Sequence, residues 1–334
     1  MLALLASACG TPPAKPAATP TPVVADTAPR APLDYVPAAG LRWLCTARPQ
    51  RIFRDSALRA LALSVLDTER LDAFTMLTGI DLRELEAGAI AGYDLGTLYV
   101  VALGAPDGGT ARARFQERLT NGAQVKQPQL KLYRLLGTRA GEPLALVSVH
   151  DRLLAFAAGD PSLARVAEAY AMRRLKSPTA LHGAALSVLP EAPSDALAAV
   201  YFPGPFTGDW ARAAYGVLGS AQALDVTVEA AAPESLHLTL TLVGDFPVGD
   251  ERSKLERAWT DLQGSSTGQL FGLNQIKKMS IVADLHHLTW SGEVPAAALV
   301  AGLRAATIAN VPEMFGEHRV EPAGSPVEPA GQPR

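Results

Sequence analysis

The chain has 334 residues, of which 48% are hydrophobic and 19% are charged, and its formal net charge is −3. This length allows one large domain or two ordinary ones, each with a sizeable core. No apolar run approaches the ~18 residues that a membrane-spanning helix needs, which excludes a transmembrane body. The negative charge and the scattered basic residues, with Lys277-Lys278 and Arg173-Arg174 the densest pairs, argue against nucleic-acid binding.

Residues 1–8 read MLALLASA, an apolar stretch that ends in small residues directly before Cys9. A run rich in Pro, Ala and Thr follows, and this order resembles the lipobox of bacterial lipoproteins, in which the cysteine is acylated and becomes the first residue of the mature chain. The resemblance implies that Cys9 is the lipidation site and that residues 1–9 are a signal remnant. Ala6 stands at position −3, where Leu is usual, and no Lys or Arg precedes the apolar stretch, so we expect the translation start to lie upstream.

The residue after the cysteine is Gly10. In the lipoprotein family an Asp at this position implies retention in the inner membrane, so the resemblance implies attachment to the outer membrane instead. The body of the protein is then expected to be periplasmic or exposed at the cell surface.

Both ends of the chain have the composition of unfolded segments. Residues 10–37 contain eight prolines among Ala, Thr and Val, too little apolar volume to build a core, and are predicted to be a flexible linker. In polyproline II geometry such a linker could hold the body as much as ~80 Å from the bilayer. Residues 316–334 are rich in Pro, Gly and Glu and are predicted to be a disordered tail.

The first half of the body, residues 38–180, alternates strand and helix patterns. Residues 41–45 predict an opening strand, and residues 58–66 carry apolar side chains at helical spacing behind a capping residue, Asp55 or Ser56. Further helices are predicted over 71–77, at 81–84, over 110–119 and after Asp160. Further strands are predicted over 89–93, 97–103, 130–136, 144–149 and 153–157.

The second half, residues 190–315, repeats this order. Strands are predicted over 196–202, 224–229, 236–243, 279–283 and 288–292, and helices over 210–217, 250–263, 269–276 and from Pro295 onward. Leucines at every second position from 236 to 242 alternate with polar residues, which is typical of a half-buried antiparallel strand. The best boundary between the halves is the segment 177–195, which holds three prolines.

These patterns predict an α+β fold of two similar repeats, each an antiparallel sheet flanked by helices. The layout resembles secreted and lipoprotein domains of bacteria to which no activity is assigned. The resemblance carries no motif at the level of single residues and implies no catalytic role.

The second cysteine, Cys45, lies in the apolar run of the opening strand. If Cys9 carries a lipid, Cys45 has no partner for an intramolecular disulfide. We interpret Cys45 as a small buried hydrophobic residue, with a reactive thiol as the alternative.

The segment Gly264-Ser265-Ser266-Thr267-Gly268 satisfies the G-x-S-x-G pattern of hydrolases, in which a strained turn from strand to helix presents the serine. Here an amphipathic helix precedes the motif, Gly264 suits a helix end, and the residues after it suit a helix cap. We therefore interpret the segment as a connection between helices. A hydrolase that uses Ser266 is the alternative.

A group of polar side chains near the C-terminus could be imagined as zinc ligands: Asp284, His286, His287, His237 and Glu293. On a strand, Asp284 and His286 share a face while His287 points the other way, so at most two converge. A zinc site needs three or four protein ligands. We expect no metal, and a zinc protein is a further alternative.

Together these features predict a non-enzymatic lipoprotein of the bacterial envelope that acts as a binding or structural module and needs no cofactor. Its expected partners are the membrane, through the lipid anchor, and an unidentified envelope protein or hydrophobic ligand, which a long tether would help to reach. The main alternative is a carrier of lipid or another hydrophobic ligand. Such a carrier would use an apolar groove between the repeats.

Overall fold

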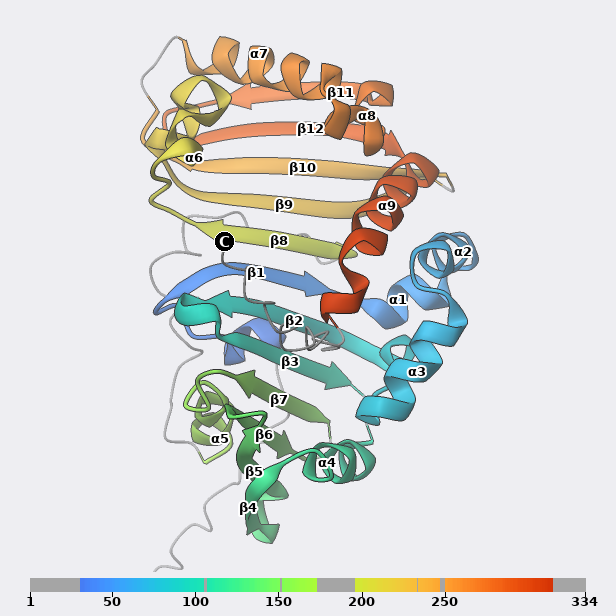
Figure 1. Cartoon of the computed structure of the whole chain (residues 1–334). Helices are drawn as coiled ribbons and strands as arrows, with labels where there is room; N and C mark the ends of the chain where they lie inside the picture. Colours follow the sequence, from blue (N-terminus) through green and yellow to red (C-terminus); the bar gives the residue numbers. More distant parts are fainter. Residues whose placement is uncertain are drawn as a thin grey trace, which may run out of the picture.

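The computed structural model of the chain describes residues 31–104, 107–150, 152–172, 196–232, 234–246 and 250–314. The strands of these residues are β1 (Leu41–Ala47), β2 (Leu85–Tyr93), β3 (Leu98–Gly104), β4 (Thr120–Gln127), β5 (Leu132–Arg139), β6 (Glu142–Val149), β7 (Leu153–Ala158), β8 (Ala198–Pro203), β9 (Ala221–Ala232), β10 (Ser235–Gly244), β11 (Lys277–Ala283) and β12 (His287–Pro295). All of them belong to one antiparallel sheet, in the order β11-β12-β10-β9-β8-β1-β2-β3-β7-β6-β5-β4 (Figure 1).

Helices lie on both faces of this sheet and at its ends. The α-helices are α1 (Pro49–Arg54), α2 (Ser56–Val65), α3 (Thr68–Thr78), α4 (Gly108–Gln116), α5 (Ala164–Ala171), α6 (Asp209–Arg212), α7 (Glu251–Gly264), α8 (Ser266–Leu270) and α9 (Ala296–Met314). The 3-10 helices are η1 (Pro32–Tyr35), η2 (Leu82–Glu84), η3 (Asp94–Gly96), η4 (Pro128–Leu130), η6 (Ala213–Ser220) and η7 (Leu273–Gln275). The chain is therefore α+β, as the sequence predicts.

The two halves of the chain have the same layout. The first half runs through β1, the helices α1–α3, β2, β3, α4, the strands β4–β7 and α5. The second runs through β8, α6 with η6, β9, β10, the helices α7 and α8, the strands β11 and β12, and α9. The difference is an additional pair of strands in the first half. Two structural repeats are thus confirmed, and the predicted boundary at 177–195 lies outside the described residues.

The repeats meet through their first strands. β1 pairs with β8 in antiparallel register, with Leu44 opposite Tyr201 and Cys45 opposite Val200. The two small sheets are therefore one sheet with continuous hydrogen bonding (Figure 1).

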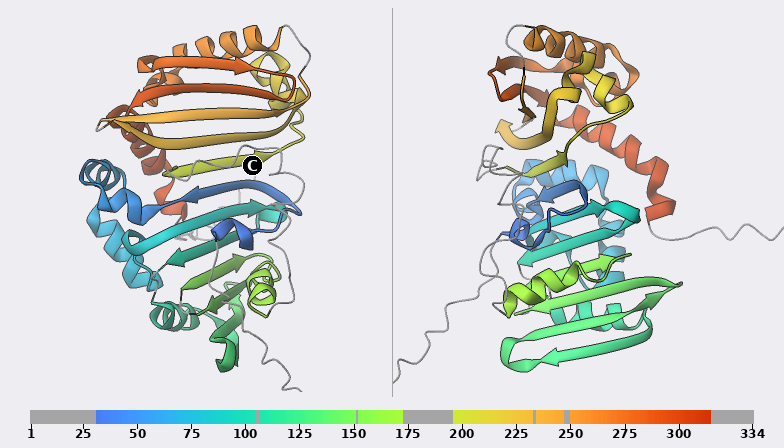
Figure 2. Two further views of the ribbon diagram at one scale, coloured as in Figure 1. Left: turned by 180° about the vertical axis from the view of Figure 1, so that it is seen from behind. Right: turned by 90° about the vertical axis from the view of Figure 1, so that its left-hand side faces the viewer.

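Different helices cover the two faces of this sheet. η1 and α5 pack on one face of the first repeat, around Tyr99, Val101 and Leu153, and Figure 2 shows both in front of the sheet in the view from behind. On the opposite face, α4 packs against the first repeat at Ala111. A third cluster joins α7 and α9 to the second repeat, with Trp259, Trp290 and Leu242 at its centre.

Local sequence signals place the helices next to β2 and β3. The carboxylate of Asp55 accepts hydrogen bonds from the N–H groups of Ala57 and Leu58, at 2.9 and 3.0 Å, and so caps α2 as predicted. Gly79 ends α3 in a left-handed conformation, with φ 72°.

The folded body begins before the expected boundary at residue 38. Residues 32–35 form η1, and the side chains of Tyr35 and Val36 are 3% and 0% exposed. Tyr35 and Val36 belong to the core of the first repeat, and Leu33 and Ala38 pack against it, so the linker ends earlier than predicted. Residues 1–30 and 315–334, which include Cys9 and the predicted tail, lie outside the described residues.

Several elements of the described chain differ from the sequence prediction. The helix α1 was not predicted, and the helix expected over 269–276 is divided into α8 and η7. β4 was not predicted, because it is an edge strand with a polar sequence and almost wholly exposed side chains. The helix expected over 210–217 is broken, because Ala214 and Tyr215 have φ values of 52° and 58°. None of the helices in the described ranges has the length and hydropathy that crossing a membrane requires.

Candidate functional site

One row of side chains crosses the sheet on the face that carries α4, α7 and α9. Strand pairing places each member opposite the next, and the row consists of Ile281, Trp290, Leu240, Val226, Val200, Cys45, Ile90, Val100, Phe156, Leu146 and Leu135. Every member is apolar or a thiol. The helices cover the row toward its ends, whereas Ile90 at its centre is 44% exposed.

A cavity of about 570 Å³ lies over this row in the first repeat, and we call it the α3–α4 pocket. Its lining residues come from four strands and from two helices with their following turns. The strands contribute Leu98, Val100, Leu144, Leu146 and Phe156, with Arg139 at the end of β5, and the helical side contributes Phe74, Leu77, Thr78, Ile80, Ala111, Phe115 and Arg118. Phe115 and Phe156 meet edge to face, with ring centroids 5.7 Å apart. The interior is almost wholly apolar, and Arg118 and Arg139 are the charged residues in the described part of its lining.

The walls of the α3–α4 pocket are fixed by a close backbone approach. A Cβ atom at Gly79 would lie 2.7 Å from the backbone N of Ala111 and 2.8 Å from the backbone C of Thr110. Glycine is required here both for this approach and for its positive φ. The guanidinium of Arg118 adds a hydrogen bond to the carbonyl of Leu77, which joins the turn after α4 to the end of α3.

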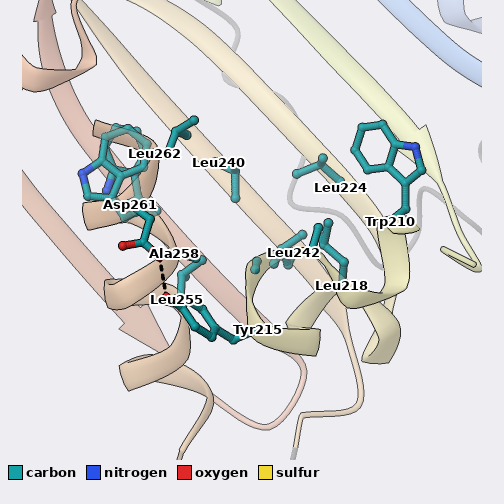
Figure 3. Close-up of a pocket in the computed structure, with 14 residues that line it drawn as sticks. Trp210, Tyr215, Leu218, Leu224, Leu240, Leu242, Leu255, Ala258, Asp261 and Leu262 are labelled. Atoms are coloured by element: carbon teal, nitrogen blue, oxygen red, sulfur yellow. Dashed lines mark hydrogen bonds between the residues drawn. The ribbon is translucent and has the colours of Figure 1, made fainter. Parts of the chain in front are cut away.

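A second cavity, of about 470 Å³, lies over the same face in the second repeat, and we call it the α7–η6 pocket (Figure 3). Leu224, Leu240 and Leu242 of the sheet line it, together with Trp210 and residues of α7 and η6. Trp259 stacks on Trp290 beside it, with ring centroids 3.8 Å apart and planes at 29°. Figure 3 also shows Tyr215 of η6 donating a hydrogen bond to the carboxylate of Asp261 on α7.

The η6 wall of this pocket has a strained backbone. Ala214, Tyr215 and Gly216 have consecutive positive φ values of 52°, 58° and 85°. A left-handed conformation costs a residue with a side chain about 1–3 kcal/mol and persists only where surrounding contacts hold it. Here the hydrogen bond from Tyr215 to Asp261 and the packing of Val217 and Leu218 in the core supply those contacts.

The two pockets occupy equivalent positions in the two repeats. In each, the floor includes the third strand of the repeat, β3 or β10, and one wall is the helix that follows that strand, α4 or α7. The other wall comes from the helices that connect the first two strands, α3 or α6 with η6. An apolar cavity is therefore a feature of the repeat itself.

A ligand-binding groove was also predicted between the repeats. Along the sheet, β1 and β8 are hydrogen-bonded to each other there. Near the ends of these strands, a hollow of about 450 Å³ is lined by Leu33, Leu103 and Leu197, by small side chains of both repeats, and by Arg48 and Glu86. The strongly apolar cavities lie inside each repeat because the helices span the sheet there.

The structure confirms that the G-x-S-x-G segment connects two helices. α7 ends at Gly264, and the hydroxyl of Ser265 accepts a hydrogen bond from the N–H of Gly268 at 3.0 Å, which caps α8. Ser265 also donates to the carbonyl of Leu262 at 2.6 Å. Ser266 is the first residue of α8 and does not follow a strand.

The five residues considered as zinc ligands are divided between two places. The carboxylate of Asp284 accepts hydrogen bonds from the N–H groups of His286 and His287, at 2.8 and 2.7 Å, in the turn between β11 and β12. These bonds lower the pKa of the Asp284 carboxyl. His237 and Glu293 are opposite each other on β10 and β12, and Glu293 is six residues from His287 along β12. Within the described ranges, no three His, Cys, Asp or Glu residues are arranged to hold a metal ion.

Cys45 lies in β1, as predicted, at the centre of the apolar row. Its side chain is partly buried, and burial raises the pKa of its thiol.

Sequence reasoning missed both pockets. Their floors do carry a signal, because β3, β6 and β7 are nearly continuous apolar runs, which indicates strands covered on both faces. Arg118 and Arg139 had no signal, since they are separated in sequence and meet the same cavity only through the fold.

Neither a protein-family model nor a curated protein sequence matches this chain. Solved structures of TP0453 are similar to it at low identity. Crystal form III has a TM-score of 0.48 and 12% identity over 83% of this chain and 99% of the TP0453 chain. Crystal form I has a TM-score of 0.46 and 13% identity, over 84% and 98% of the two chains, and crystal form IV has 0.44 and 11%, over 82% and 96%. This is a coarse similarity of fold, and no function follows from it.

Proposed function

We propose that the protein is a non-enzymatic binding module of the bacterial envelope that holds a hydrophobic ligand between its sheet and its helices. The observation that supports this best is the recurrence of an apolar cavity at the equivalent place in both repeats. Incomplete packing at a single place could be incidental. Its repetition, at positions where helices bridge the same row of apolar side chains, favours a binding role.

The size and chemistry of the cavities fit such a role. Ligand sites in proteins are mostly apolar, have volumes of roughly 300–1,000 Å³ and carry a few placed polar groups. The cavities of about 570 and 470 Å³ fall in this range, with Arg118 and Arg139 at one and Asp261 at the other. Each Å² of apolar ligand surface removed from water contributes roughly 25 cal/mol, so an alkyl chain gains several kcal/mol on entry.

The binding role can be tested with the neutral fluorescent probe N-phenyl-1-naphthylamine and the full chain carrying Cys9→Ala. We expect saturable binding. Val100→Trp places a large side chain on the floor of the α3–α4 pocket, and Ala258→Trp does the same at the α7–η6 pocket. Each is expected to remove part of the probe binding, and the two together nearly all of it.

A matched control is Ala113→Trp, an exposed position on α4 outside the lining of either pocket. This variant should bind the probe like the parent chain. Folding of all variants is checked by circular dichroism. A folded parent chain without saturable binding, or binding that the two filled variants leave intact, would contradict the proposed function.

The second part of the proposal is a lipid anchor on Cys9. The support for it is the apolar stretch with small residues before Cys9 and the proline-rich segment after it. The expected result is incorporation of labelled palmitate in the bacterial cell, lost in Cys9→Ala and kept in Cys45→Ala. Labelling that persisted in Cys9→Ala would exclude this anchor. Fractionation of the labelled protein with the outer membrane is expected.

A further inference from the structure

The rim of the α3–α4 pocket carries two guanidinium groups that come from opposite walls. Arg118 follows α4 on the helical side, and Arg139 ends β5 on the sheet side. Arg139 stands four residues after Leu135 on the same strand, so it lies on the same face as the pocket floor. The turn after Arg139 is tight, because Ala140 and Gly141 have φ values of 51° and 86°, and it holds the end of β5 in place.

Two carboxylates, Glu117 and Glu142, lie near the two cations. Glu117 pairs with Arg114 at 3.3 Å, and Arg118 donates to the carbonyl of Leu77. Glu142 is opposite Arg139 across the hairpin. Among the residues that the structure describes, neither Arg118 nor Arg139 forms an ion pair. Burial, together with the positive charges of Arg139 and Arg114, lowers the pKa of Arg118, and Glu117 opposes this shift without reversing it. The rim therefore has an excess of positive charge beside an apolar interior.

We propose that the α3–α4 pocket selects an anionic amphiphile with a single acyl chain, whose head group binds between Arg118 and Arg139. Guanidinium groups bind carboxylate and phosphate oxygens with paired N–H donors, so a carboxylate head group and a phosphate head group would be bound in the same way. The acyl chain lies on the floor formed by Val100, Leu146 and Phe156. This inference rests on the proposed function and adds the chemical class of the ligand.

The α7–η6 pocket provides an internal contrast. Among the residues that the structure describes, Asp261 is its one charged lining residue, and the carboxylate of Asp261 accepts the hydrogen bond from Tyr215. A negative group at this rim disfavours an anionic ligand. The two equivalent cavities are thus expected to differ in their preference for charge while sharing an apolar interior.

The test uses the full chain with Cys9→Ala and Ala258→Trp, so that the α3–α4 pocket is the remaining site. Oleate and oleyl alcohol have the same chain and differ in the charge of the head group. Each is used to displace bound N-phenyl-1-naphthylamine at about pH 8, where a solvated carboxylate is ionised. We expect oleate to bind about tenfold more tightly, as hydrogen bonds between charged groups imply. The preference should weaken as salt concentration rises.

Arg139→Leu is expected to reduce the preference for oleate to within about twofold, and Arg118→Leu to reduce it in the same direction. Arg165→Leu, at an exposed position on α5 on the other face of the sheet, is the matched control and should leave the preference unchanged. Glu142→Gln removes the negative charge opposite Arg139 and should strengthen oleate binding. Because Glu142→Gln keeps both arginines, it tests the role of charge at this rim even if an arginine variant fails to fold.

The outcomes separate the ligand class from the proposed function. Equal binding of oleate and oleyl alcohol would overturn the anionic head group and leave a hydrophobic-ligand site. A preference for oleate that persists in both arginine variants would place the anion elsewhere and also overturn the inference. If the probe binds but neither compound displaces it, an acyl chain is not the ligand of this pocket. If the probe itself does not bind, both this inference and the proposed function are wrong. Replacing oleate by inorganic phosphate separates a free anion from an amphiphile, and phosphate alone is expected not to displace the probe.

Discussion

The residue with the clearest electrostatic consequence lies on the face of the sheet away from the pockets. Asp225 of β9 is opposite Tyr201 of β8 and Thr241 of β10, and both neighbours are buried. Burial raises the pKa of Asp225 from its ordinary value of 3.8 to about 6. The folded chain therefore binds this proton more tightly than the unfolded chain does.

This shift predicts the pH dependence of stability. Between about pH 4 and about pH 6 the unfolded state loses the proton first, so the contribution of Asp225 to stability is lost as pH rises through this window. Asp225→Asn removes the charged form and should raise the free energy of unfolding by roughly 1–3 kcal/mol above the window, with little effect below it. Urea unfolding at both ends of the window measures the difference. An equal effect of the substitution at both pH values would show that ionisation is not its cause.

At the scale of elements, the contact between α3 and α4 sets the shape of the first pocket. Gly79 permits this contact because it has no Cβ and a φ of 72°. The C-terminus of α3 can then lie against the first turn of α4, and both helices face the same cavity.

Gly79→Ala should therefore destabilise the fold by more than the conformational cost of a positive φ, which is about 1–3 kcal/mol. The matched control is Gly96→Ala, because Gly96 also has a φ of 72° but an added Cβ there meets no atom within 4 Å. The difference in free energy of unfolding between the two variants measures the helix contact. Gly79→Ala should also weaken probe binding, whereas Gly96→Ala should not. Equal effects of both substitutions would contradict this account of the contact.

Most elements could be predicted from the sequence because each carries its own local signal. The leucines at every second position of β10 predict a half-buried strand, and Asp55 marks a helix start that the structure confirms. β4 could not be predicted, because an exposed edge strand needs no apolar alternation. The broken helix at Ala214 and Tyr215 could not be predicted either, because contacts from other elements impose its positive φ values.

The candidate site was less predictable than the fold. Its apolar floor follows from the continuous apolar runs of β3, β6 and β7, which indicate covering helices. The cavity depends on how closely those helices approach the sheet. The presence of both Arg118 and Arg139 at one cavity depends on the hairpin between β5 and β6, which fixes the position of Arg139. Neither feature is local in sequence.

At the scale of the whole molecule, the shared sheet couples the two repeats. The core of the first repeat includes Tyr201, Ala223 and Val243 of the second. The hydrogen bonds between β1 and β8 would also lose their partners if one repeat unfolded alone. We expect the repeats to unfold in one cooperative transition.

This expectation can be checked with two observables in the same urea titration. Three of the four tryptophans, Trp210, Trp259 and Trp290, belong to the second repeat, so fluorescence reports mainly on that repeat. Circular dichroism reports on the whole chain. The two transitions should coincide. Two separated transitions would show that the repeats are independent domains.

If each repeat holds a hydrophobic ligand between sheet and helices, the number of ligands bound per chain should reveal it. The full chain with Cys9→Ala is incubated with a lipid extract of a bacterial envelope and analysed by mass spectrometry under non-denaturing conditions. We expect bound amphiphiles whose number per chain falls by one in Val100→Trp and by one in Ala258→Trp. A folded chain that binds none, or a number that both substitutions leave unchanged, would contradict it.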